Sequence, residues 1–88
     1  MSQRVEDTLL ALLSQVREGE SINPNEVAKA VATDVSNPEG WRRELPKVRA
    51  VAVGMARQGR IEILRKGKPV DPEDVRGIYR LRLPQTAA

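Results

Sequence analysis

The chain has 88 residues and contains no cysteine and no histidine. Disulfides, thiolate or imidazole metal sites, and Ser-His-Asp or Cys-His catalytic centres are therefore excluded. Phosphate-binding loops and paired carboxylates are also lacking, so we expect a protein that is not an enzyme and that uses no metal or cofactor.

Positive charge is concentrated in the second half of the chain. Residues 1–40 carry three basic and seven acidic side chains, a net charge of −4, whereas residues 41–88 carry twelve basic and five acidic ones, a net charge of +7. The modest total of +3 therefore conceals a strongly basic C-terminal half. Basic charge arranged on a helix and a hairpin is typical of a surface that binds a phosphate backbone.

The length suits one domain, which we assign to residues 1–83, followed by a disordered tail over 84–88. Its core must be aliphatic, because phenylalanine is absent and Trp41 and Tyr79 are the only aromatic residues. The N-terminal segment has neither the apolar run of a signal peptide nor one long enough to span a bilayer. We therefore expect a cytoplasmic protein without a membrane partner.

The first helix is predicted over residues 3–18, where apolar residues recur at helical spacing. Gly19 is placed to take up the left-handed conformation after the last turn. The stripe that should face the core consists of Val5, Leu9, Leu12 and Val16, widened by Leu10 and Leu13.

A second, short helix is predicted to begin at Pro24, after an extended link at residues 21–22, and to fray at Thr33 and Asp34. Asn23 can cap its N-terminus, Pro24 is suited to the first helical position, and Glu26 can reach back to the amide of Asn23. The start of this helix is therefore well specified.

The third helix is predicted over residues 46–58, because Pro46 disfavours helical geometry at the residue before it and Gly59 is a favourable C-cap. A separate helical turn is expected over 41–45, after a linker at 35–40. The buried stripe of the third helix should consist of Val48, Val51, Ala52 and Met55.

Beyond Gly59 the hydrophobic period changes from that of a helix to that of a strand. Ile61 and Ile63 alternate with polar residues, and after a polar loop over 66–77 a second alternating segment covers 78–83. We predict that the two segments pair as a hairpin with one apolar and one basic face. The second segment should place Tyr79, Leu81 and Leu83 on the apolar face and Arg80 and Arg82 on the other.

Helix, extended link, helix, helix, strand, loop and strand is the order of elements in a winged helix domain. We therefore predict an α+β, winged helix-turn-helix fold, with three helices followed by a two-stranded β-hairpin wing. The alternative is a three-helix domain with an accessory hairpin packed elsewhere, and the sequence does not distinguish the two.

Six segments carry a recognisable pattern: Ser21-Ile22-Asn23-Pro24-Asn25-Glu26-Val27-Ala28, Trp41-Arg42, Pro46-Lys47-Val48-Arg49, Gln58-Gly59-Arg60-Ile61, Gly67-Lys68-Pro69-Val70-Asp71-Pro72 and Arg80-Leu81-Arg82. Over nearly the whole chain this pattern resembles a family of small bacterial proteins of unknown function. The resemblance implies a compact winged helix domain and a bacterial origin. It implies no activity and no functional residues.

The basic residues of the second half are expected to bind double-stranded DNA. In a helix-turn-helix the N-terminal part of the last helix enters the major groove, where Arg42 and Arg43 would give limited base discrimination and the other cations would contact phosphates. DNA is expected ahead of RNA because a protruding helix fits the narrow A-form groove poorly. The predicted nucleic-acid-binding residues are Arg42, Arg43, Lys47, Arg49, Arg57, Arg65 and Lys68.

Three features weigh against confident DNA recognition. The segment 71–74, Asp-Pro-Glu-Asp, reads as a capped helical turn that phosphates would repel. The third helix has no asparagine to pair with adenine. Glu62 can pair with Arg80 and Arg82 across the hairpin and so neutralise part of the basic surface.

The two aromatic residues have both structural and functional interpretations. Trp41 precedes two arginines and can stack on a sugar or base, but we favour a role in closing the core under the helix-turn-helix. Tyr79 should belong to the core, with its hydroxyl at the rim.

A protein-interaction module or small dimerising adaptor is the alternative function. In that case the acidic first half or the remaining apolar surface of the first helix would dock a protein partner or a second copy. The residues imply no small-molecule ligand.

Overall fold

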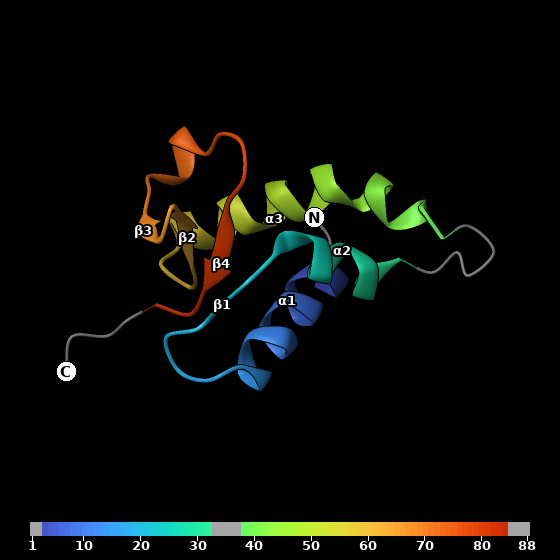
Figure 1. The fold of residues 1–88 in the computed structure, drawn as a ribbon, viewed down its shortest axis with the longest axis horizontal. Coiled ribbons are helices and arrows are strands. Elements are labelled where there is room, and N and C mark those ends of the chain that lie inside the picture. The colour runs from blue at the N-terminus through green and yellow to red at the C-terminus, as the bar shows by residue number, and fades with distance from the viewer. Residues whose placement is uncertain (1–2, 33–37, 85–88) are drawn as a thin grey trace.

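Three helices and a four-stranded antiparallel sheet form the protein in its computed structural model, which describes residues 3–32 and 38–84 (Figure 1). The α+β class predicted from the sequence is confirmed. The predicted fraying at Thr33 and Asp34 lies outside the described residues, and the predicted linker at 35–40 and the predicted tail at 84–88 lie partly outside them.

The helices are α1 (Gln3–Gln15), α2 (Pro24–Val31) and α3 (Leu45–Arg57), with short 3-10 helices η1 (Gly40–Glu44) and η2 (Pro72–Asp74). The strands are β1 (Ser21–Ile22), β2 (Glu62–Arg65), β3 (Lys68–Pro69) and β4 (Arg80–Arg82).

Helix α1 is shorter than predicted, because it ends at Gln15 and a turn follows. Gly19 adopts the expected left-handed conformation, with φ of +87°. The buried stripe of α1 runs with a spacing of four, so Leu13 is buried and Leu12 only half-buried. The fully buried residues are Val5, Leu9 and Leu13.

The predicted capping box at the start of α2 is confirmed. The Asn23 side chain accepts a hydrogen bond of 2.8 Å from the amide of Asn25, and the Glu26 carboxylate accepts one of 2.9 Å from the amide of Asn23. Pro24 occupies the first helical position, where no amide donor is needed. The backbone amides of Asn23 and Asn25, which have no hydrogen-bond partner within the helix, are thereby satisfied.

Helix α3 follows η1 without a gap, and it begins one residue before Pro46. The boundary predicted at this proline is therefore confirmed to within one residue. Gly59 ends the segment with φ of +75°, as expected of a C-cap. The four residues predicted to be buried all are: Val48, Val51, Ala52 and Met55.

The predicted two-stranded hairpin wing is wrong, because the sheet has four strands in the order β1-β4-β2-β3. Strand β2 pairs with β4 as predicted, but it also pairs with β3 through the tight turn Lys66–Gly67. Both turn residues have positive φ, 53° and 81°, which is the geometry of a type I′ hairpin turn. Strands β1 and β3 have two residues each, too few to show an alternating pattern in the sequence.

Strand β2 also departs from the predicted alternation, since Ile63 and Leu64 are both buried. A strand with neighbours on both sides belongs to the middle of a sheet, where side chains on both faces can be covered. Ile63 joins the main core, whereas Leu64 is buried outside that cluster. The hairpin therefore lacks the purely basic face expected of it.

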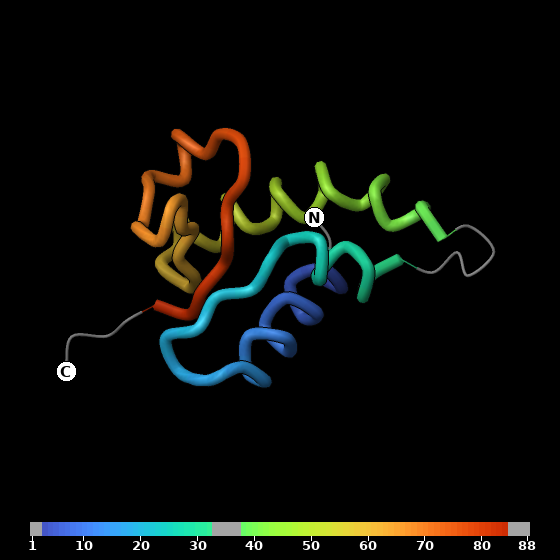
Figure 2. The backbone as a smooth tube through the Cα atoms, in the orientation of Figure 1, coloured from blue at the N-terminus to red at the C-terminus, as the bar shows by residue number. Residues whose placement is uncertain are grey.

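Strand β4 lies between β1 and β2 and joins the C-terminal part of the chain to its first half (Figure 2). Ile22 pairs with Leu81, and both side chains are buried in the same core as the helices. Tyr79 is also buried there, as predicted, whereas Leu83 is 38% exposed. No helix in the described part of the chain is long and apolar enough to cross a membrane.

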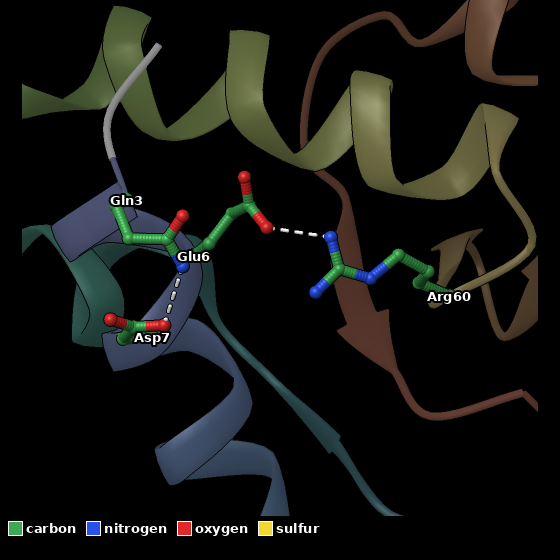
Figure 3. Close-up of polar contacts among 4 residues, drawn as sticks. All are labelled: Gln3, Glu6, Asp7 and Arg60. Atoms are coloured by element: carbon green, nitrogen blue, oxygen red, sulfur yellow. Dashed lines mark hydrogen bonds and ion pairs between the residues drawn. The ribbon is translucent and has the colours of Figure 1, made fainter.

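An ion pair connects α1 to the turn after α3 (Figure 3). The Arg60 guanidinium donates to the Glu6 carboxylate at 2.6 Å, while Gln3 donates to Asp7 at 2.9 Å within α1. Arg60, one of the cations of the basic C-terminal half, is thus engaged with an acidic residue of the first helix.

Replacing Asn23 with alanine should destabilise the protein by about 1 kcal/mol, because the capping hydrogen bond to Asn25 is removed. For a domain of this size the melting temperature should fall by about 4–8 °C for each kcal/mol, measured by circular dichroism. Asn25→Ala is the matched control, since the Asn25 side chain makes no hydrogen bond to the described residues. Equal melting temperatures for the two variants would contradict a role for the capping box.

Candidate nucleic-acid interface

One side of α3 is open to solvent. Lys47, Ala50, Gly54 and Arg57 follow one another at spacings of three and four residues, which places them together on the helix. We call these four residues the α3 face. A Cβ atom built on Gly54 would have no atom within 4 Å, so the space in front of the face is empty.

The two charged residues of the α3 face make exposed ion pairs. Lys47 Nζ lies 3.5 Å from the Glu44 carboxylate, and Arg57 pairs with Glu73 of η2. Both basic side chains are more than half exposed, at 56% and 57%. Because such pairs contribute only about 0–1 kcal/mol, a phosphate can replace either carboxylate at little cost.

The two arginines of η1 lie just before α3 and differ in their surroundings. Arg42 pairs with Glu39 at 2.5 Å, and its guanidinium lies 4.8 Å from the centre of the Trp41 ring. Arg43 is exposed and makes no ion pair or hydrogen bond with any described residue. Arg43 is therefore the freer of the two predicted base-reading arginines.

Trp41 is half-buried and packs against the hydrophobic core, in line with the structural role favoured for it. Two cations approach its ring, because Lys29 Nζ of α2 also lies 4.9 Å from the ring centre. Such contacts contribute about 0.5–1 kcal/mol at exposed sites. The contact from Lys29 links α2 to η1 just before α3 begins.

Arg49 lies apart from the α3 face. It follows Lys47 by two residues, which turns it about 200° around the helix axis. Its guanidinium donates to the backbone carbonyl of Val75, in the segment that leads to β4. The structure therefore separates Arg49 from Lys47, whereas Arg57, eight residues further on, lies about 80° from Arg49 around the helix axis.

The hairpin of β2 and β3 carries three cations, Arg65, Lys66 and Lys68, which we call the hairpin cations. Lys66 and Lys68 are exposed, and Arg65 is half-buried with its guanidinium beside Gly77. No carboxylate of the described residues pairs with any of the three within 4.0 Å. The hairpin lies beyond the C-terminal end of α3, so cations are found near both ends of the helix (Figure 1).

Acidic residues partly neutralise the surface, as the sequence indicated. Segment 71–74 forms the predicted capped turn, in which the Asp71 carboxylate accepts a hydrogen bond of 2.8 Å from the amide of Glu73. This turn lies beside α3, where Glu73 reaches Arg57. Glu62 pairs with Arg82 at 2.6 Å, but Arg80 instead donates to the hydroxyl and carbonyl oxygens of Ser21.

A cavity of about 530 Å³, which sequence reasoning did not foresee, lies on the Arg49 side of α3. Three segments separated in sequence form it, so no local motif could have indicated it. Burial raises the pKa of the Tyr79 hydroxyl above its ordinary value of 10.0, and the charge of Arg49 partly opposes this shift. The lining residues are Asn23, Pro24, Asn25, Leu45, Pro46, Arg49, Gly77, Ile78 and Tyr79.

The architecture defines a small α+β protein with a basic helix face and no evident catalytic centre among the described residues. Residues 2–84 match the family described as "Protein of unknown function (DUF3253)", and the chain belongs to that family. Comparison with curated proteins gave no match. The predicted membership of a small family of unknown function is thus confirmed.

Gly54→Ala should stabilise the protein by about 0.5–1 kcal/mol, because alanine is a better helix former and its methyl group would meet no neighbour. Gly59→Ala is the matched control, and it should destabilise by about 1–2 kcal/mol because Gly59 has φ of +75°. Urea denaturation of both variants measures the two effects. A loss of stability in Gly54→Ala would show that the helix is constrained there.

Tyr79 should ionise above its ordinary pKa, since burial favours the neutral phenol. This raised pKa stabilises the fold fully below about pH 10, and the contribution disappears as the pH rises through the pKa of the folded state. Absorbance of the tyrosinate reports the midpoint directly, because the chain has one tyrosine. The same titration in denaturant provides the reference, and coincident midpoints would contradict the prediction.

Proposed function

We propose that the protein is a winged helix protein that binds double-stranded nucleic acid, DNA in preference to RNA, through the α3 face and the hairpin cations. The observation that carries the proposal is the positive charge of α3 together with the small residues on its open side. This helix contains three basic and no acidic residues, and its open side has small residues between two cations. A helix of this kind can approach a phosphate-lined groove closely.

The strand pairing supports a winged helix. The strand between α1 and α2 pairs with the last strand, which in turn pairs with the strand that follows α3. In the proposed winged helix, α2 and α3 are the helix-turn-helix and the β2–β3 hairpin follows them. In this proposal the wing is the short hairpin, while η2 folds back beside α3.

The mechanism is electrostatic docking with limited sequence discrimination. Helix α3 is about 20 Å long, so Arg43 before it and the hairpin cations beyond it can flank a major groove about 12 Å wide. Cations on either side would contact phosphates, while the α3 face enters the groove. Arg43 is the residue best placed to reach a base edge, because Arg42 is held by Glu39 and Trp41.

Binding to a labelled random DNA duplex should be detectable by fluorescence anisotropy, and the logarithm of the affinity should fall linearly with the logarithm of salt concentration. Removing two cations in Arg43→Gln/Lys47→Gln should reduce the slope by about one unit for each phosphate that the variant no longer neutralises. Arg4→Gln/Arg17→Gln, which removes the same charge from the N-terminal half, should leave the slope unchanged. Equal slopes for the two double variants would refute the proposed surface.

A steric variant tests the same surface without changing charge. Gly54→Leu adds a side chain in open space on the α3 face, so the fold should be retained. Close approach of a duplex would be blocked, and the affinity should fall about tenfold or more, a change that corresponds to about 1.4 kcal/mol. Unchanged affinity together with an intact fold would show that α3 does not enter the groove.

Docking of a protein partner through α1 is the second candidate. The described part of the chain exposes two large hydrophobic side chains, Ile78 and Leu83, and neither belongs to α1. On α1 the apolar residues Leu10 and Leu12 are half-buried, so this helix offers little apolar surface to a partner, which favours the nucleic-acid proposal. Sedimentation at several protein concentrations separates the two, since self-association through α1 needs no nucleic acid.

A further inference from the structure

The cavity beside α3 has a lining of unusual composition. Prolines, Leu45, Ile78 and the Tyr79 ring make it largely apolar, and Arg49 is its one charged residue, because no aspartate or glutamate of the described chain lines it. Its volume, about 530 Å³, is in the range of pockets that hold small molecules in proteins. A largely apolar pocket with one cation and no acid is complementary to an apolar anion.

Arg49 is fixed at the edge of this cavity. One terminal nitrogen of its guanidinium donates to the Val75 carbonyl, which orients the group and leaves other N–H donors for a ligand. A guanidinium matches the two oxygens of a carboxylate with parallel hydrogen bonds. Tyr79, another lining residue, carries a hydroxyl group that can donate a hydrogen bond.

Ile78 provides an independent indication of an apolar ligand. It lines the cavity, yet it is 86% exposed in the free protein. An apolar ligand in the cavity would cover this side chain and remove its apolar surface from water, which is favourable. Two proline rings and the aromatic ring of Tyr79 are also among the lining residues, and ring carbons of this kind pack well against an aromatic ligand.

We propose that this cavity binds a small aromatic carboxylate, with its ring against Pro24, Pro46, Ile78 and Tyr79 and its carboxylate on Arg49. The site is distinct from the α3 face, because none of the four residues of that face lines the cavity. The inference therefore does not depend on nucleic-acid binding.

Nuclear magnetic resonance titration of the full chain with benzoate, naphthoate and indole acetate tests the site. At least one of the three should shift the amide signals of Asn25, Arg49, Gly77 and Ile78 together, along one saturable curve. The neutral amide of the same compound should bind about tenfold more weakly, because it cannot form the charged pair with Arg49. Absence of saturable shifts with all three acids, or equal binding of acid and amide, overturns the proposal.

Three single variants test whether the ligand binds in this cavity. Arg49→Gln should weaken binding of the acid about tenfold, and Ile78→Glu should weaken it similarly by placing a negative charge at the rim. Ile78 is 86% exposed, so its replacement should leave the fold intact. If Arg49→Gln is destabilised, the result with Ile78→Glu therefore decides whether the ligand binds in this cavity. Lys47→Gln removes a cation from the other side of α3 and should not change the affinity. Unchanged binding in Ile78→Glu, or equal losses in Ile78→Glu and Lys47→Gln, overturns the assignment.

Discussion

The pairing of β1 with β4 is the constraint on which the rest of the structure depends. It joins Ile22 to Leu81, which lie far apart in the chain, and both side chains enter the common core. The guanidinium of Arg80 reinforces the pair by donating to two oxygens of Ser21, at 2.6 and 3.0 Å. Because β1 leads directly into the capping box of α2, this pairing also fixes where α2 begins. The segment before β4 is positioned by the same contact, and it forms one wall of the cavity.

The distribution of ion pairs explains why the basic half of the chain is not a uniformly basic surface. Glu6 of α1 pairs with Arg60, and Glu62 of β2 pairs with Arg82 of β4. The cations at the junction of the helices and the sheet therefore connect elements of the fold. The pairs on the α3 side are different, because the cation of each, Lys47 or Arg57, is more than half exposed and so accessible to a phosphate. The net charge of a segment therefore overstates the number of cations available to a partner.

The local features of the fold could be predicted from the sequence, and its long-range pairings could not. The capping box at Asn23, the C-cap at Gly59 and the stripe of α3 each depend on residues close together in the chain. Strands of two residues carry no periodic signal, and β1 acquires its role only when β4 lies beside it. Among the candidate residues, the direction of Arg49 was missed for the same reason, since its partner Val75 is 26 residues away.

Helix α3 thus presents two different surfaces to solvent. One side has small residues and replaceable ion pairs, and the other places Arg49 between a backbone carbonyl and a cavity. An anion bound at Arg49 would lie within about one helix diameter of the α3 face, a separation similar to the Debye length, so its charge would be only partly screened there. A mechanical route between the two sides also exists, through the segment from Val75 to Tyr79 that Arg49 holds against the helix. That segment is continuous with η2, whose Glu73 contacts Arg57, so a shift of the cavity wall would reach the α3 face through this pair.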